Sequence, residues 1–377
     1  MNNAKSGIEQ LRNNYFRAVD YWLIVPILML TMIGLYVLNG VLSSGFEDYP
    51  RNLYRQAGAA VLGTVVALFI CLLDTHFLKL IGWGIYIVSN LLLFVMMFDG
   101  YDLTYKWGAD AWMNIPVIGT FQPSEIAKIG IVIVAAYLFE DLADKKYSWK
   151  RGFIYLGLLY ALPLVLIQRQ PDTGTIMVIG FSFICMLFIW GMKFRYFILS
   201  ISLAIVGGLP IVWNFFLEPF QKQRILSVLF EGSDPQTEYN LIQAKSAISS
   251  GGLIGNTTGN FVRVPVKESD FIFSAVSEHM GFIGTTAVIV LAFAFLLRCL
   301  YVASKTSQMA YSLTVIGLTG SFAFHFIENM GMNVGLLPIT GVPLPFISLG
   351  GTALMVNFIS IGIILNISMQ RNLARRR

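Results

Sequence analysis

The feature that most limits how this chain can fold is its series of long apolar segments. A helix of about 20 apolar residues crosses the hydrocarbon layer of a bilayer. Hydrophobic residues make up 56% of the 377 residues and charged residues only 12%, which excludes an ordinary soluble domain. We predict an all-α, polytopic integral membrane protein that forms one domain over residues 1–377, with a long extracellular segment at 217–272. About ten spans are expected, roughly at 20–42, 56–74, 77–98, 124–139, 151–167, 174–190, 194–216, 273–297, 309–330 and 351–369.

Lysine and arginine are unevenly divided between the predicted loops. Cytoplasmic loops of membrane proteins carry an excess of these residues, which places both termini in the cytoplasm. The net charge of +5 is then explained by orientation and by contact with anionic headgroups, so nucleic-acid binding is not expected. The inner basic residues are Lys5, Arg12, Arg17, Lys79, Lys145, Lys146, Lys150, Arg151, Lys193, Arg195, Arg298, Lys305, Arg371, Arg375, Arg376 and Arg377.

The outer segment contains one stretch with helical spacing of apolar residues. Residues 236–250 predict a short amphipathic helix at the outer interface. Gly251 and Gly252 follow it and are expected to end it.

Two charged residues lie at membrane depth in "FQPSEIAKIG". Glu125 and Lys128 are three residues apart, so they share one face of a helix that Pro123 can begin. Charges inside a span are costly and for that reason mark functional sites. An ion pair that locks two helices together explains the same spacing, and both interpretations stay open.

A second carboxylate follows "QRQP" at the outer start of a span. Asp172 stands at a helix N-terminus, where the dipole favours negative charge, so an N-cap is the simpler interpretation of this residue alone. Gln168, Arg169 and Gln170 add a polar rim on the same outer side as Glu125. A shared outer site is the second interpretation.

A third carboxylate stands in "KESDFIF", directly before another span. Asp270 or Ser269 could cap the helix that begins near Phe271. A carboxylate half-buried among phenylalanines and near other acids is expected to have a raised pKa, which suits a general base near neutral pH. Two turns deeper, Glu278 could face the same way as Asp270, whereas His279 is typical of a hydrogen-bonded interior residue.

The stretch from Glu328 through Asn357 is interrupted by three prolines and several glycines. Irregular backbone at membrane depth is tolerated only when it is buried in protein or lines a cavity. The Gly350–Gly351 pair before the last span could bring backbone N–H groups close to an anionic ligand. We therefore predict a folded-in loop at a binding site.

Five separated blocks of the sequence resemble one known family. "QPSEIAK", "QPDTGT", "SDPQ…AISSGGL", "DFIFSAVSEHMGFIG" and "NVGLLPITGVPLPFISLGG" are similar, in the same order, to blocks of the SEDS family of shape, elongation, division and sporulation proteins. The resemblance covers nearly the whole chain. It implies a ten-helix fold and a peptidoglycan glycosyltransferase that polymerises lipid II at the outer face of the bacterial cytoplasmic membrane. The RodA-like branch, which serves cell elongation, is more similar than the FtsW division branch.

The resemblance also implies roles for individual residues. The family's essential acid falls on Asp270, its intramembrane Glu and Lys on Glu125 and Lys128, and its Asp after Gln-Pro on Asp172. These four are the expected catalytic residues, and Asp270 is the expected general base. The chain departs from the family's usual pattern at Asn256, Val266 and His279.

Polymerising a lipid-diphosphate sugar requires a base for the acceptor's 4-hydroxyl and donors for the leaving diphosphate. A magnesium or manganese ion bridging Asp270 or Glu125 to the diphosphate would add to the second task. No metal-binding motif is readable, since Cys71, Cys185 and Cys299 lie in apolar spans without ligand spacing. The expected substrate-binding residues are Gln122, Arg224, Lys245, Arg263, Lys267, Ser348, Gly350 and Gly351.

The implied partners are lipid II, a class B penicillin-binding transpeptidase and other cell-elongation membrane proteins. The chain shows no Ser-x-x-Lys domain of its own for cross-linking. Other functions remain open. A lipid II flippase should place polar residues along the full membrane depth and show an inverted repeat. A small-solute transporter or channel leaves the long outer segment without a role. A division- or sporulation-type paralogue fits the same residues.

The polar residues also predict where the substrate lies. Asp270, Asp172, Glu125 and the "PLPFISLGG" loop are expected to line one outer cavity. An apolar groove for the polyprenyl tail is expected to lead from that cavity to the bilayer.

Overall fold

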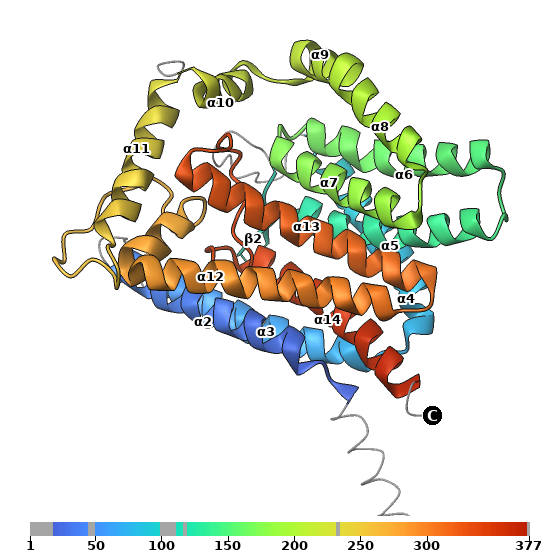
Figure 1. The fold of residues 1–377 in the computed structure, drawn as a ribbon, viewed down its shortest axis with the longest axis horizontal. Helices are drawn as coiled ribbons and strands as arrows, with labels where there is room; N and C mark the ends of the chain where they lie inside the picture. The colour runs from blue at the N-terminus through green and yellow to red at the C-terminus, as the bar shows by residue number, and fades with distance from the viewer. Residues whose placement is uncertain (1–17, 44–49, 99–110, 116–118, 231–233, 375–377) are drawn as a thin grey trace, which may run out of the picture.

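The computed structural model describes residues 18–43, 50–98, 111–115, 119–230 and 234–374. Within these residues, regular structure is helical except for one short hairpin, and Figure 1 shows the long helices packed side by side. Among the described residues, eight helical segments are long and apolar enough to cross a membrane, and the expected spans at 124–139 and 194–216 are not among them. The predicted polytopic fold class is confirmed. The eight segments are α2 (Tyr21–Ser43), α3 (Arg51–Leu72), η1 with α4 (Thr75–Phe77 and Leu78–Val95), α6 (Trp149–Gln168), α7 (Thr173–Trp190), α12 (Ile272–Lys305), α13 (Met309–Val334) and α14 (Gly351–Ala374).

Helix α5 (Pro123–Ala143) occupies the interior of the bundle. It packs against α4, α6, α7 and α13, and nearly all its side chains are buried. A Cβ at Gly130 would lie 2.7 Å from the backbone nitrogen of Tyr86, so this glycine permits the close approach of α4. Because α5 is surrounded by protein, Glu125 and Lys128 lie in the protein interior.

The predicted span at 194–216 is a helix of changing pitch. It consists of α8 (Phe194–Leu203), a π-helical turn (Ala204–Gly208), α9 (Leu209–Ile211) and a second π-helical turn (Val212–Phe216). Pro210 has no backbone N–H to donate, which is one physical reason why the helical hydrogen-bond pattern is irregular in this segment. Figure 1 shows the segment leading from the end of α7 toward α10 (Pro219–Leu229).

The predicted extracellular segment contains two helices, α10 and α11 (Pro235–Ser250). Helix α11 confirms a helix at the predicted residues 236–250, its place at the outer interface stays a prediction, and α10 was not predicted. The Asp234 carboxylate caps α11 by accepting a hydrogen bond from the Gln236 N–H at 3.3 Å. The buried face of α11 carries Ala244 and Ala247 and packs on α12 and α13.

Helix α12 is broken at Gly281, where φ is 64° and ψ is −163°. The chain that follows α11 fits into this break. Phe282 N–H donates to the Gly252 carbonyl at 2.8 Å, and Ile283 N–H donates to the Leu253 carbonyl at 3.2 Å. The break therefore attaches the outer segment to α12, nine residues beyond its start at Ile272.

A short hairpin leads into α5. Strands β1 (Met113–Ile115) and β2 (Gly119–Phe121) pair antiparallel, with Met113 opposite Phe121. Thr352 Oγ1 donates to the Thr120 carbonyl at 3.2 Å. The hairpin thereby joins the beginning of α5 to the beginning of α14.

Candidate active site

Asp270 lies in the turn between the outer segment and α12. The N-cap residue of α12 is Phe271, which provides no side-chain cap, and the Ser274 N–H donates instead to Asn333 Oδ1 at 3.0 Å. The capping explanation for Asp270 is therefore wrong, because an asparagine of α13 performs that task. The Asp270 carboxylate accepts a hydrogen bond from Ser269 Oγ at 3.1 Å.

Burial raises the pKa of the Asp270 carboxyl group to about 6. The Ser269 hydroxyl and the Arg224 guanidinium favour the charged form and limit the rise, whereas the negative charge of Glu268 adds to it. This confirms the raised pKa predicted from the sequence. A carboxylate with a pKa near 6 is deprotonated at neutral pH and still accepts a proton effectively.

The backbone of Asp270 is joined to residues 335–350, which we call the 335–350 loop. Asn329 Nδ2 donates to both the Asp270 carbonyl and the Val342 carbonyl, each at 2.9 Å. Asn333 Nδ2 donates to the same Asp270 carbonyl at 3.0 Å. A Cβ at Gly341 would lie 3.4 Å from Asp270 Oδ2, so this part of the loop runs beside the carboxylate.

The far end of the 335–350 loop is held by α3. Gln56 Nε2 donates to the Ser348 carbonyl at 2.9 Å, and the Gly350 N–H donates to Gln56 Oε1 at 3.0 Å. Ser348 Oγ donates to the Ser269 carbonyl at 2.7 Å. The expectation that the Gly350 N–H is available to an anion is therefore wrong, because Gln56 uses it. Gly351 is the first residue of α14.

Asp172 is the N-cap of α7, as the simpler interpretation of the sequence states. Its Oδ1 accepts from the Thr175 N–H at 3.0 Å, and its Oδ2 accepts from Thr175 Oγ1 at 2.7 Å. Gln122 Nε2 also donates to Oδ2, at 2.8 Å, which ties the cap to the residue before α5. Burial raises the pKa of Asp172, the two Thr175 bonds oppose this, and the nearby Glu125 charge adds to it.

The start of α7 contacts the 335–350 loop as well. A Cβ at Gly174 would lie 2.8 Å from Val342 Cγ2 and 3.3 Å from the Thr340 carbonyl oxygen. Asp172 and Asp270, 98 residues apart in the printed sequence, therefore flank residues 340–342 of the same loop.

Glu125 and Lys128 form a buried ion pair, with 2.7 Å between Lys128 Nζ and Glu125 Oε1. Lys128 Nζ also lies 3.0 Å from His325 Nε2 on α13. The predicted pairing is confirmed, and the lysine bridges α5 to α13. The link between α5 and α13 agrees with the interhelical lock, one of the two interpretations of the sequence. It is connected to the 335–350 loop through His325, whose Nδ1 lies 3.1 Å from the Pro343 carbonyl oxygen.

A small cavity of about 20 Å³ adjoins this pair, which is room for about one water molecule. Its lining comes from α5, α13 and α14. Neither Asp172 nor Asp270 lines it, so this cavity is not the single outer cavity predicted from the sequence. The lining residues are Glu125, Lys128, Ile129, Leu318, Ser321, Phe322, His325, Val356, Asn357 and Ser360.

The four predicted cationic residues occupy different positions. Arg224 of α10 reaches the Ile339 carbonyl in the 335–350 loop, with its Nη1 at 3.4 Å, and its charge acts on Asp270. Lys245 of α11 is exposed and lies beside Gly335 at the end of α13. Arg263 is exposed on the outer segment. Of Arg224, Lys245 and Arg263, Arg224 is the one whose charge acts on the candidate base.

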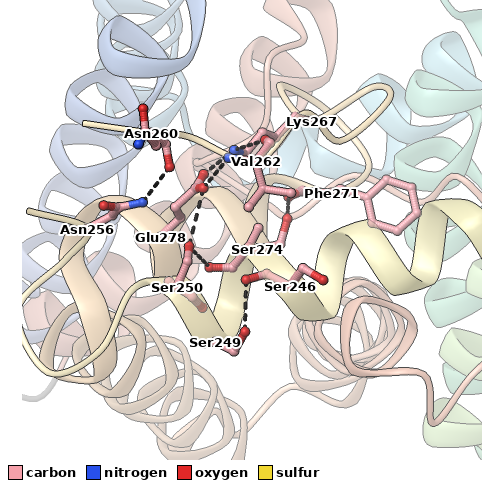
Figure 2. Close-up of polar contacts among 12 residues, drawn as sticks. Ser246, Ser249, Ser250, Asn256, Asn260, Val262, Lys267, Phe271, Ser274 and Glu278 are labelled. Carbon is pink, nitrogen blue, oxygen red and sulfur yellow. Dashed lines mark hydrogen bonds and ion pairs between the residues drawn. The ribbon is translucent and has the colours of Figure 1, made fainter. Parts of the chain in front are cut away.

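Lys267 is buried in a separate polar cluster, which Figure 2 shows. Its ammonium group forms an ion pair with Glu278 and donates to the Val262 carbonyl at 3.0 Å. The Val262 N–H donates to Glu278 Oε1 at 2.6 Å. Lys267 therefore neutralises a buried carboxylate and is not presented to a diphosphate. Glu278 consequently faces the outer segment rather than the Asp270 carboxylate, contrary to the expectation from helical spacing.

Sequence reasoning missed the side chains that hold the loop. Gln56, His325, Asn329 and Asn333 are all buried, and each contacts the loop, Asp270 or Lys128. The polar residues of α13 recur at 325, 329 and 333, one helical face in steps of four. That periodicity was the available signal in the sequence.

Comparisons with known proteins agree with this arrangement. Residues 18–373 match the FtsW/RodA/SpoVE family model, described as cell cycle protein. The peptidoglycan glycosyltransferase MrdB of Escherichia coli K12 is 30% identical over 358 residues, covering 92% of this chain and 94% of the relative. Stage V sporulation protein E of Bacillus subtilis is 29% identical over 360 residues, covering 93% and 96%.

Solved structures give the same result for the fold. One chain of a peptidoglycan synthase complex that coordinates polymerization and crosslinking superimposes with a TM-score of 0.80, at 26% identity, covering 94% of this chain and 98% of that one. The crystal structure of the rod shape determining protein RodA of Thermus thermophilus gives a TM-score of 0.67 at 25% identity, covering 94% and 97%.

The fold and the buried polar groups define a multi-pass membrane protein whose carboxylates gather around one irregular loop. With the family model matching almost its full length, the chain belongs to the FtsW/RodA/SpoVE family of cell cycle proteins, which is the SEDS family predicted from the sequence blocks.

Proposed function

We propose that this protein is a peptidoglycan glycosyltransferase that polymerises lipid II into glycan strands, with Asp270 as the general base. The supporting observation is the Asp270 carboxylate, which is not engaged as a helix cap and has a pKa raised to about 6. Relatives of this chain include proteins named peptidoglycan glycosyltransferases.

The reaction assigns separate tasks to the base and the cations. Asp270 takes the proton of the acceptor's 4-hydroxyl while that oxygen forms a bond to the donor sugar's anomeric carbon. The bond from that carbon to the lipid diphosphate breaks, and the diphosphate leaves with the electron pair. Arg224, beside the same loop, is the best-placed cation to stabilise the leaving group. Glu125 and Lys128 form an ion pair within α5, and Lys128 is linked to the loop through His325, which contacts the Pro343 carbonyl.

A magnesium or manganese ion that bridges Asp270 or Glu125 to the diphosphate would be held mainly by oxygens of the substrate and water. Within the described ranges, no group of three or more His, Cys, Asp and Glu side chains is arranged to hold a metal ion. Glu125, one of the two expected ligands, is already paired with Lys128.

We further propose that the active site faces the outside of the cell, that both termini are cytoplasmic, and that the enzyme serves elongation. The distribution of basic residues supports the orientation. Limited proteolysis of sealed inside-out vesicles should cleave the basic C-terminal tail and leave α11 intact. Cleavage at α11 in those vesicles would reverse the topology.

The activity is tested with purified protein, lipid II and a gel that resolves glycan strands. Wild-type protein should produce strands, and Asp270→Asn should produce none, because the amide cannot accept the proton. Asp234→Asn is the matched control, since asparagine also caps a helix, and it should retain activity. Strand synthesis by well-folded Asp270→Asn would remove Asp270 from the mechanism. Lipid II translocation by wild-type protein without any strands would indicate a flippase.

A class B penicillin-binding transpeptidase is the partner that we propose, because glycan strands require a separate enzyme for cross-linking. A chain of similar fold occurs in a complex described as coordinating polymerization and crosslinking. Co-purification with such a transpeptidase and faster strand synthesis in its presence are the expected results. An enzyme whose rate and purification are unaffected by the transpeptidase would act alone.

A further inference from the structure

His325 is a buried histidine on α13 that contacts two different parts of the candidate site. Its Nε2 lies 3.0 Å from Lys128 Nζ, and its Nδ1 lies 3.1 Å from the Pro343 carbonyl oxygen. The ring therefore stands between the Glu125–Lys128 ion pair and the 335–350 loop.

The two partners determine which ring nitrogen carries the proton. A carbonyl oxygen only accepts hydrogen bonds, so Nδ1 must carry hydrogen and donate to Pro343. The ammonium group of Lys128 only donates, so Nε2 must be the unprotonated nitrogen that accepts from it. Lys128 thus stabilises the one neutral tautomer that holds the loop, while its other contact neutralises Glu125.

Pro343 directly follows the part of the loop that runs beside the candidate base. Val342 is held by Asn329, which also holds the Asp270 backbone, and Gly341 lies against the Asp270 carboxylate. A shift at Pro343 would therefore move the chain segment that packs on Asp270. Other charged groups near these residues are Arg224 and Glu268 beside Asp270, and Glu328, whose Oε1 accepts from Thr340 Oγ1 at 2.9 Å.

We propose that His325 is a positioning residue for glycosyl transfer: held in one tautomer by Lys128, it fixes the Pro343 carbonyl and thereby the loop that packs against Asp270. This inference rests on the proposed function, because its readout is strand synthesis. Both ring nitrogens are engaged by Lys128 and Pro343, so the role assigned to His325 involves no direct contact with the acceptor hydroxyl or the diphosphate.

The test compares two substitutions of similar size and different chemistry. In His325→Gln, the amide nitrogen can donate to Pro343 and the amide oxygen can accept from Lys128. In His325→Met, the volume is kept and both hydrogen bonds are lost. We expect kcat for lipid II to stay within about threefold of wild type in the Gln variant and to fall at least about tenfold in the Met variant, with KM little changed. Thr314→Val, a buried change elsewhere on α13, should leave kcat unchanged.

Each outcome separates this inference from its alternatives. A residue needed only for packing would be replaced better by Met than by Gln, so equal or higher activity in His325→Met overturns the proposal. Equal loss in both folded variants also overturns it. If His325→Met does not fold, His325→Asn is used in its place. The asparagine side chain is one methylene shorter than that of glutamine, so its amide cannot reach both Lys128 and Pro343. Wild-type kcat in His325→Asn then overturns the proposal. Absence of strands with wild-type protein would reject the proposed function instead.

Discussion

At the scale of single residues, the site depends on which polar groups are already engaged. Asp172 is fully used as a cap and as a partner of Gln122, and Lys267 is used by Glu278. Among the described residues, the Ser269 hydroxyl is the one group that donates a hydrogen bond to the Asp270 carboxylate. Its position beside Arg224 makes it the residue whose protonation should control the reaction.

The first residue-scale prediction concerns pH. A general base works when deprotonated, so the rate should rise with pH through about 6 and level off above it. Removing the nearby positive charge in Arg224→Gln weakens the stabilisation of the carboxylate and should move this rise to higher pH. Lys222→Gln, on the same helix, is the control and should leave it in place. A pH profile of initial strand synthesis measures both, and an unmoved rise in Arg224→Gln would contradict the assigned contact.

At the scale of elements, the break in α12 determines how the outer segment is attached. Residues beyond Gly281 would donate to carbonyls of the preceding turn in an unbroken helix. Instead, Phe282 and Ile283 donate to Gly252 and Leu253. The backbone of one segment therefore completes the hydrogen bonding of another, which requires a residue without a side chain at the crossing.

Gly281→Ala should destabilise the protein strongly. The φ and ψ values belong to a region that is essentially restricted to glycine, at a cost of about 1–3 kcal/mol for other residues. In addition, the new Cβ would lie 2.4 Å from the Leu253 carbonyl carbon. Gly180→Ala on α7 is the control, because nothing lies within 4 Å of that Cβ. Thermal unfolding in detergent is the measurement, and equal melting temperatures for the two variants would refute the argument.

At the scale of the whole molecule, helices far apart in the chain are tied together at the end opposite the candidate site. Asp20, just before α2, accepts from Arg298 Nε of α12 at 2.9 Å and from Arg298 Nη2 at 3.0 Å. Ser368 Oγ of α14 donates to the same carboxylate at 3.0 Å. One buried carboxylate therefore connects three helices.

Asp20→Ala should lower the stability by about 3 kcal/mol. This is the low end of the range for removing one partner of a buried pair, chosen because the Arg298 side chain is 26% exposed and can be partly hydrated. Asp144→Ala is the control: Asp144 pairs with Lys146 at 3.7 Å and both are more than half exposed, so the loss should stay below about 1 kcal/mol. Urea or thermal unfolding of both variants gives the loss of stability. Similar losses in Asp20→Ala and Asp144→Ala would show that the Asp20 carboxylate does not stabilise the packing of the three helices.

The sequence by itself determined the membrane class, most of the long apolar helices and the family, because each of these depends on local composition, spacing or motif order. The amphipathic helix at 236–250 and the Glu125–Lys128 pair follow from helical periodicity for the same reason. Element bounds were less well determined where backbone irregularity intervenes, as in the helix at 194–216 and the break at Gly281.

Only the tertiary structure decided which polar groups remain available, since hydrogen bonds between distant segments have no local signature. Gln56 engages Ser348 and Gly350 almost 300 positions along the chain, which removes an expected anion donor. Asn333 caps α12 from another helix and so releases Asp270 from that task. The sequence shows which hydrogen bonds a side chain is able to form. Which partner it bonds depends on the segments that the fold places next to it.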